Sequence, residues 1–413
     1  MNQSPALRRG EPVWCSERDC GQPKSAYPSL RGHHASDVVI VGGGITGALI
    51  AEAFAAEDIS VSVLERGSVG CGSTVASAAL LLQEPDNGLA QLSRRYGRAA
   101  AQRIWRLSHE AVSELVRQLQ RNRIACDLVE RDAVYFATTG DAVRRLRAEH
   151  QLRLRAGFDS EWLTAAALGY LTGVPGRGAI RTRGNAQFDP YRACVGIMHA
   201  AAAAGAHVFE RSAVTRITPR RDGVRVHTRD GRVDASRVVI ATGYATRHFR
   251  PLAGRFRMHH TYVLATPPLS AAERHRVGLG DLMIWDTERP YHYARWTPEH
   301  RLLLGGADRP VRRGRTRNAQ FATATRELRA DFETILPALD GIGVEHAWEG
   351  LFAITPDSLP YIGPHRRYPK HLFALGYGGN GMTFASLAAR LLLEHWRGVR
   401  SPDQVLFGFG RLR

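Results

Sequence analysis

The stretch that decides the fold runs from Asp37 to Glu65 and reads DVVIVGGGITGALIAEAFAAEDISVSVLE. Its first apolar run, Val38 to Val41, is mostly β-branched, which is typical of a strand buried on both faces of a parallel sheet. Glycines with G-x-G-x-x-G spacing follow, and the composition of residues 45–56 predicts a helix. A second predicted strand, residues 61–64, ends at an acid. A strand, a glycine turn, a helix and a strand in this order predict a bound dinucleotide.

The glycines and the acid have separate physical tasks in such a unit. Gly42 permits the tight turn, Gly44 lets a pyrophosphate approach the backbone, and Gly47 lets the helix pack close to the strand. The helix N-terminus offers the phosphates a partial positive charge of roughly half a unit. Glu65 is placed to bond a ribose hydroxyl, which favours FAD or NAD over NADP. The alternative is an ordinary βαβ unit in which Glu65 is a surface acid.

Four later segments bear on the choice between FAD and NAD. They are GSVGCGSTVASAALL (67–81), a turn leading into a predicted apolar helix; SRVVIAT (236–242), a predicted buried strand before Gly243; WEGLFAITPDSLPYIG (348–363); and FALGYGGNGMTFASLAARLLL (373–393). In this order they resemble the D-amino-acid oxidase-like family of FAD-dependent oxidoreductases, which includes glycine oxidase, sarcosine oxidase and γ-glutamylputrescine oxidoreductase. The resemblance extends from about Trp14 to Gly398.

These segments also supply the candidate cofactor residues. The glycine-rich turn before the helix predicted at residues 382–393 forms a second helix N-terminus, which can stabilise negative charge on a reduced flavin. The resemblance implies flavin contacts from the backbone of Gly379 to Met382, and an adenine contact from Val214. Ser73 and Thr74 could donate to phosphate or ribityl oxygens, or only cap a helix. The full candidate set is Gly42, Gly44, Ile45, Thr46, Gly47, Glu65, Arg66, Ser73, Thr74, Ala76, Ser77, Val214, Ala241, Thr242, Gly243, Gly376, Gly378, Gly379, Asn380, Gly381 and Met382.

Length and segment order predict the architecture. A chain of 413 residues is expected to form two domains. We expect an α/β (α+β) fold with a Rossmann-like FAD-binding domain and a discontinuous substrate domain, in which residues 256–308 form antiparallel strands. The predicted boundaries are an N-terminal extension (1–36), the FAD-binding domain (37–90, 178–250 and 345–400), the substrate domain (91–177 and 251–344) and a C-terminal tail (401–413).

Other sequence features narrow the location and the partners. No run approaches the roughly 20 apolar residues of a membrane span, and the N-terminus lacks a signal-peptide pattern, so a cytoplasmic location is expected. The five cysteines are interpreted as free thiols without a metal site, although Cys15 and Cys20 are close enough to suggest a metal or a disulfide. The formal net charge is +17, and only Lys24 and Lys370 among the 56 basic residues are lysines. We favour biased codon usage over a nucleic-acid partner, and a solvated loop for the basic run at residues 309–317.

The resemblance implies the chemistry and exposes one departure from the family. A C–H bond beside an amine nitrogen would give a hydride to the flavin, and the imine would hydrolyse. Family members that act on α-amino acids carry a carboxylate-binding arginine where this chain has Phe352. An amine, a polyamine conjugate or a carboxylate held from elsewhere is therefore favoured. Strand alternation places Tyr291, Tyr293 and Arg295 on one face as candidate substrate residues, unless that face is a sheet exterior.

Two further departures concern the flavin. Sarcosine oxidases attach it to a cysteine at a position near Gly350, and related dehydrogenases use a histidine at a position near Ala76. Neither residue present here can form the bond, so noncovalent FAD is expected. Sarcosine oxidases activate oxygen with a lysine at a position near Leu303, and this chain has no lysine there. The sequence therefore leaves open whether oxygen or another compound is the electron acceptor. The alternatives are a same-family domain acting on modified tRNA, a flavin-binding subunit without turnover, and an NAD-linked dehydrogenase.

Overall fold

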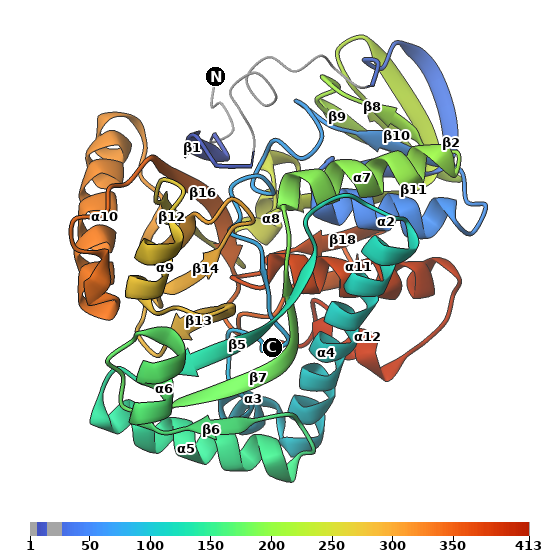
Figure 1. Cartoon of the computed structure of the whole chain (residues 1–413). Helices are drawn as coiled ribbons and strands as arrows, with labels where there is room; N and C mark the ends of the chain where they lie inside the picture. Colours follow the sequence, from blue (N-terminus) through green and yellow to red (C-terminus); the bar gives the residue numbers. More distant parts are fainter. Residues whose placement is uncertain (1–5, 15–26, 413) are drawn as a thin grey trace.

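The computed structural model describes residues 6–14 and 27–412, which form two β-sheets with helices packed on them (Figure 1). This arrangement confirms the expected mixed α/β fold. Cys15 and Cys20, for which the sequence suggested a metal or a disulfide, lie outside the described residues. Among the described residues, Cys126 and Cys194 are free thiols.

The smaller sheet contains the predicted dinucleotide unit. Its parallel strands lie in the order β18, β11, β2, β3 and β8, so the two strands of the unit are neighbours and Val38 lies opposite Val61. β17 pairs antiparallel with β18, and β9 and β10 extend β11 as an antiparallel hairpin. The strands are β2 (Gly32–Val41), β3 (Val61–Leu64), β8 (His207–Phe209), β9 (Arg216–Arg220), β10 (Gly223–His227), β11 (Gly231–Gly243), β17 (Tyr361–His365) and β18 (Tyr368–Leu375).

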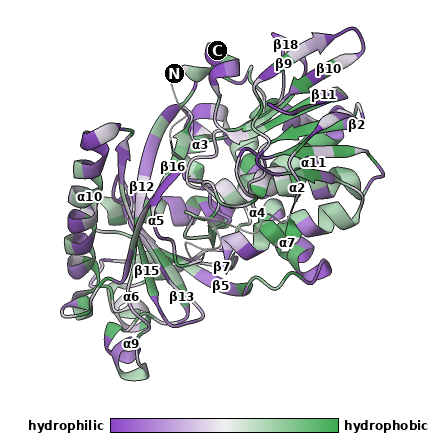
Figure 2. Ribbon diagram, turned by 90° about the horizontal axis from the view of Figure 1, so that it is seen from above, coloured by the Kyte–Doolittle hydropathy of each residue, from purple (hydrophilic) through white to green (hydrophobic). Residues whose placement is uncertain are grey.

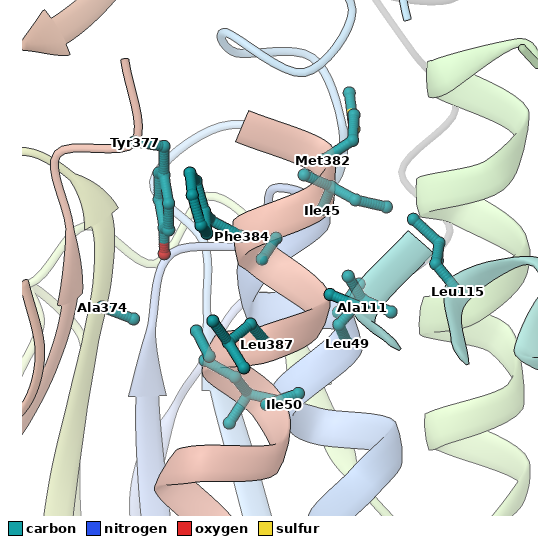
Figure 3. Packing of buried hydrophobic residues seen from close by; sticks show 14 of the residues in the cluster. Ile45, Leu49, Ile50, Ala111, Leu115, Ala374, Tyr377, Met382, Phe384 and Leu387 are labelled. Carbon is teal, nitrogen blue, oxygen red and sulfur yellow. The ribbon is translucent and has the colours of Figure 1, made fainter. Parts of the chain in front are cut away.

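Four helices build the main core against this sheet: α2 (Ile45–Ala55), α4 (Arg98–Arg121), α7 (Pro190–Ala203) and α11 (Gly381–Trp396). Figure 3 shows Leu49 of α2 between Leu387 of α11 and Ala111 of α4. α7 begins at Pro190, because the Asp189 carboxylate accepts the N–H groups of residues 191 and 192 at 2.9 and 3.0 Å. These helices place two N-termini, those of α2 and α11, beside the same edge of the sheet.

The larger sheet has ten strands, mostly antiparallel, in the order β1, β16, β12, β15, β14, β13, β5, β7 and β4, with β6 paired to β7. The exception is the parallel pair of β13 and β5. The strands are β1 (Arg8–Gly10), β4 (Leu80–Leu81), β5 (Val129–Phe136), β6 (Glu161–Leu163), β7 (Ala179–Gln187), β12 (Arg257–Ala265), β13 (Leu282–Asp286), β14 (Tyr293–Trp296), β15 (Leu302–Pro310) and β16 (His346–Ile354).

Helices cover the outer side of this sheet. α10 (Gly314–Ile335) packs on β12 and β15 through Leu328 and Phe332, which are buried, and Figure 2 shows its polar residues against the more hydrophobic interior of the molecule.

The remaining helices are α3 (Leu89–Tyr96), α5 (Gly140–Arg155), α6 (Ala165–Thr172), α8 (Arg250–Ala253), α9 (Ala271–Val277) and α12 (Pro402–Phe407), with 3₁₀ turns η1 (Arg247–Phe249) and η2 (Pro337–Leu339). No helix in the described part of the chain is long and apolar enough to cross a membrane.

The structure differs from the sequence-based boundaries in several places. β7 and β16 fall within segments assigned to the FAD-binding domain, but both pair in the larger sheet. The C-terminal segment is not a free tail, because α12 buries Phe407 completely. Residues 67–81 form turns and the short β4 rather than a helix. Residue composition could not reveal these outcomes, since each depends on a partner far away in the sequence.

The basic run at residues 309–317 is also not a solvated loop throughout. It spans the end of β15 and the start of α10. Arg309 forms an ion pair with Glu327, and Arg317 forms one with the buried Glu349. Part of the positive charge of this run is therefore neutralised by carboxylates within the fold.

Candidate active site

A single cavity of about 810 Å³ lies between the two sheets and reaches from the dinucleotide turn to the strands of the larger sheet. Every predicted cofactor residue except Gly47 and Gly376 lines it, as do Tyr291, Tyr293 and Phe352. The two exceptions shape the backbone instead. A Cβ atom on Gly47 would lie 1.9 Å from the carbonyl oxygen of Gly42, and one on Gly376 would lie 2.7 Å from both Phe256 and Thr355.

The dinucleotide turn leaves the N-terminus of α2 open to the cavity. Gly42 has a φ of +114°, and a Cβ atom there would lie 2.6 Å from the carbonyl oxygen of Ala241. Gly44, the N-cap residue, lines the cavity without a side chain to fill it. Backbone N–H groups at a helix N-terminus bind phosphate well. The turn therefore fits the pyrophosphate of a dinucleotide.

Thr74 completes this N-terminus from another segment. Its Oγ1 atom accepts the N–H group of Ile45 at 3.0 Å, so it caps α2 rather than a helix of its own. Its hydroxyl hydrogen is still available to a phosphate oxygen. Ser73 differs, because its hydroxyl donates to the carbonyl oxygen of Leu351 at 2.7 Å. Of the two hydroxyls, that of Thr74 is the better phosphate donor.

Glu65 lies at the end of β3 and lines the cavity. Its carboxylate accepts the N–H groups of Gly43 and Gly67, each at 2.7 Å. Burial raises the pKa of this carboxyl group, and the two N–H groups partly offset the shift. A carboxylate has about four lone-pair positions, so the two oxygens held in place by backbone can still accept ribose hydroxyls.

The N-terminus of α11 forms the second charged helix end of the cavity. The consecutive residues Gly378 to Met382 all line the cavity. Asn380 fixes the neighbouring chain, because its Oδ1 accepts the N–H of Asp86 at 2.8 Å and its Nδ2 donates to the carbonyl of Glu84 at 2.9 Å. The N–H of Gly379, one of the expected flavin contacts, donates to Asp86 at 2.8 Å in this structure.

The segment of Ala76, Ser77 and Ala78 forms another wall and is held by three side chains. The carbonyls of these residues accept, in turn, the indole N–H of Trp348 at 2.9 Å, the indole N–H of Trp14 at 2.8 Å and the Nε–H of Arg295 at 2.6 Å. A Cβ atom on Gly350 would lie 2.9 Å from the Cβ atom of Ala76. The two positions at which relatives were expected to attach the flavin are therefore adjacent in space.

The structure separates Arg295 from the two tyrosines with which the sequence grouped it. The guanidinium is buried, does not line the cavity, and also donates to the carbonyls of Phe188 and Trp296 at 2.8 and 3.2 Å. Burial lowers its pKa to about 9. Its donors are bonded to backbone carbonyls, so it is not placed to clamp a substrate carboxylate.

The end of the cavity beside the larger sheet is aromatic and acidic. Tyr291 and Trp285 lie with ring centroids 6.0 Å apart, and the Tyr293 ring lies 6.1 Å from that of Tyr291. The hydroxyl of Tyr291 is 3.4 Å from a carboxylate oxygen of Asp86, and burial raises the pKa of Tyr291. Phe352 also lines the cavity and offers no charge.

Sequence reasoning missed four residues at this end: Asp86, Asp308, Thr261 and Trp285. None belongs to a recognisable motif. Thr261 and Asp308 come from β12 and β15, which pair in the sheet, whereas Asp86 follows β4 along the chain. Only the position of Asp308 after an apolar, strand-like run could have been noticed.

Comparisons with known proteins agree with this site. A family model described as FAD-dependent oxidoreductase matches residues 37–395. The γ-glutamylputrescine oxidoreductase of Escherichia coli (strain K12) is 27% identical over 377 residues, which cover 90% of this chain and 86% of that protein. The glycine oxidase of Bacillus licheniformis is 25% identical over 370 residues, covering 87% and 92%.

Solved structures share the fold. The crystal structure of glycine oxidase from Geobacillus kaustophilus has a TM-score of 0.77 at 23% identity and covers 92% of this chain and 100% of its own. The family model specifies FAD, which excludes the NAD-linked dehydrogenase that the glycine motif also allowed. With a glycine turn at one helix N-terminus, the carboxylate of Glu65 and a second helix N-terminus around one cavity, the chain belongs to the DAO family of FAD-dependent oxidoreductases.

Proposed function

We propose that this protein oxidises the C–N bond of an amine or amino acid, and that it prefers amines without a free α-carboxylate. The bound FAD supplies the hydride acceptor for the C–H bond next to nitrogen, and the imine product hydrolyses in water. The observation that carries the proposal is the composition of the cavity beside the larger sheet. It combines aromatic rings, the apolar Phe352 and two carboxylates, and its cationic lining residues lie elsewhere.

The arginine and histidine side chains that line the cavity are Arg66, Arg247 and His248. Arg66 is close enough to Glu65 to lower its pKa, and His248 hydrogen-bonds the backbone of Val214. Glu65 and the loop of Val214 form the nucleotide end of the cavity. Recognition of a substrate carboxylate usually needs an arginine or another donor set. Among the described residues, those that line the opposite end of the cavity offer tyrosine hydroxyls but no arginine or lysine.

The chain's own residues would position the substrate. Tyr293, Trp285 and Phe352 form walls that exclude water from an alkyl amine, and close positioning of this kind lowers the barrier without a protein nucleophile. Tyr291 is close to the N-terminus of α11, because a Cβ atom on Gly379 would lie 2.0 Å from its hydroxyl. The tyrosine hydroxyl is therefore near both the expected flavin contacts at residues 379–382 and the carboxylate of Asp86.

Anaerobic stopped-flow measurement of flavin reduction tests the proposal with matched pairs, each amino acid against its decarboxylated amine. We expect the amine to reduce the flavin faster in most pairs, by roughly tenfold or more, because a lost charged hydrogen bond changes specificity by about that factor. Consistently faster reduction by the amino acids contradicts the preference. A flavin that no amine or amino acid bleaches contradicts the proposed reaction and favours a subunit without turnover.

A further inference from the structure

Resting on the proposed function, we propose that Asp308 determines specificity by binding a second, positively charged group of the substrate. The preferred substrates are then diamines, or amines that carry another cation at a distance from the oxidised C–N bond. The argument uses the position of Asp308 in the cavity, its incomplete hydrogen bonding and the charges around it.

Asp308 lies near the end of β15 and lines the cavity with Thr261 and Tyr293 of the neighbouring strands. The hydroxyl of Thr261 hydrogen-bonds the carboxyl group. The Oδ1 atom is buried and has no hydrogen-bond partner among the described residues. A buried carboxylate oxygen without a donor is unfavourable, and Asp308 as a whole lines the cavity, so its carboxyl group is suited to a donor that arrives with the ligand.

The charges around Asp308 favour a cation over any other donor. Asp86 is close enough to raise its pKa further, and burial together with this carboxylate raises the pKa of Asp308 to about 7. The opposing group is His292, which lies between Asp286 and Asp331 at 2.7 and 3.2 Å. His292 is thus already matched by two carboxylates, which leaves the acidic end of the cavity unneutralised.

Arg289 is the other nearby cation, and it does not line the cavity. Its guanidinium lies 5.7 Å from the ring centroid of Tyr291 and lowers the pKa of Asp86. The residue is exposed. Arg289 therefore offsets the charge of Asp86 in part, while the cation that faces Asp308 is His292, which Asp286 and Asp331 already match.

Aromatic rings next to these acids suit an ammonium group. Trp285 stacks on Tyr135 at 3.7 Å between centroids, and its ring centroid lies 6.0 Å from that of Tyr291 at an interplanar angle of 73°. A cation over tryptophan or tyrosine rings is stabilised by their electron-rich faces. A carboxylate beside aromatic rings therefore recognises an ammonium better than a neutral polar group.

The group bound at Asp308 must differ from the amine that is oxidised. An amine gives up a hydride from its neighbouring carbon only when its nitrogen is neutral. A carboxylate that pairs with an ammonium raises the pKa of that ammonium and keeps it protonated. Binding at Asp308 would therefore inhibit oxidation of the same nitrogen, whereas a second nitrogen held there would only anchor the substrate.

The test compares three probes of equal chain length on the FAD-loaded protein: butane-1,4-diamine, butylamine and 4-aminobutanoate. Anaerobic titration with flavin bleaching as the signal gives an apparent dissociation constant and a limiting reduction rate for each. We expect the diamine to bind roughly ten- to a hundredfold more tightly than butylamine. In Asp308→Asn the ratio of the two constants should fall to near one. Asp281→Asn, a matched change at a side chain that is 82% exposed, should keep the wild-type ratio.

The outcomes separate this inference from the proposed function. Bleaching by all amines with no preference for the diamine, or an unchanged ratio in Asp308→Asn, overturns the role of Asp308 while the reaction class stands. If no probe bleaches the flavin, the same titration is followed by the shift of the oxidised flavin spectrum. A shift specific to the diamine and lost in Asp308→Asn then supports the site, and equal shifts overturn it. Should Asp308→Asn fail to fold, the wild-type ratio of diamine to butylamine decides alone.

Discussion

The Nε atom of Arg295 donates to the carbonyl oxygen of Ala78 at 2.6 Å, which joins a strand of the larger sheet to the cavity wall. The indole N–H groups of Trp348 and Trp14 likewise donate to the carbonyl oxygens of Ala76 and Ser77. Backbone carbonyls held by buried side chains have little freedom to move. Arg295 is therefore a positioning residue for the wall beside the flavin.

Replacement of Arg295 by methionine should weaken both the fold and FAD retention. The change leaves the carbonyls of Ala78 and Phe188 without these donors, at a cost of about 1 to 3 kcal/mol for each buried group. Thermal unfolding with and without added FAD measures the effect, and Arg295→Lys, which keeps a charge and some donors, should be intermediate. Unchanged stability with weaker binding of carboxylate substrates would show that Arg295 is a substrate clamp after all.

Replacement of Gly44 by valine should abolish FAD binding. A Cβ atom at this position points at Thr74 Oγ1, 3.0 Å away, and the rest of the side chain would occupy the space where the pyrophosphate meets α2. Gly343→Val is the matched control, because a Cβ atom there meets nothing within 4 Å. Flavin absorbance of the purified proteins measures occupancy, and a fully yellow Gly44→Val protein would contradict the assigned phosphate position.

Thr74→Val should weaken FAD binding by roughly tenfold while Thr74→Ser retains it. Valine has nearly the same shape as threonine but can neither accept the N–H of Ile45 nor donate to phosphate. Loss of a helix N-cap costs about 1 kcal/mol, and the lost phosphate contact adds to it. Fluorescence titration of the apoprotein with FAD gives the affinities. Equal FAD affinities for the valine and serine variants would show that the Thr74 hydroxyl does not contribute to FAD binding.

Acid or heat should release FAD into solution. Gly350 and Ala76 stand together where relatives were expected to carry tethering side chains, and neither can form a bond to the flavin. Absorbance of the supernatant after precipitation distinguishes free FAD from bound FAD. Yellow colour that stays with the precipitate would demonstrate a covalent attachment at some other residue.

Asp308 should make stability depend on pH. Its pKa rises from 3.8 to about 7 on folding, so the folded protein binds more protons between these values. The corresponding stabilisation is present below pH 4 and is lost as the pH rises through about 7. Relative to wild type, Asp308→Asn should therefore be more stable at pH 8 than at pH 5. Urea unfolding at pH 5 and pH 8 measures the difference in unfolding free energy between the two proteins. An equal difference at both pH values would contradict the raised pKa of Asp308.

The amino-acid sequence by itself determined the dinucleotide unit. β3 has the predicted bounds, and α2 differs from the prediction by one residue at its end. Each of these features depends on contacts within a few residues or on a burial pattern along one short segment. Such contacts form whatever the rest of the chain does, so residue order alone is enough to predict them.

Only the tertiary structure decided the substrate end of the cavity. The partners of Arg295 at Ala78 and Phe188 lie 217 and 107 residues away in the sequence, and Asp86 and Asp308 come from different segments that meet at one cavity. Strand alternation groups side chains by face, but it does not say which sheet a strand joins or what the face contacts. Those choices depend on the burial of both sheets together, which is a property of the whole chain.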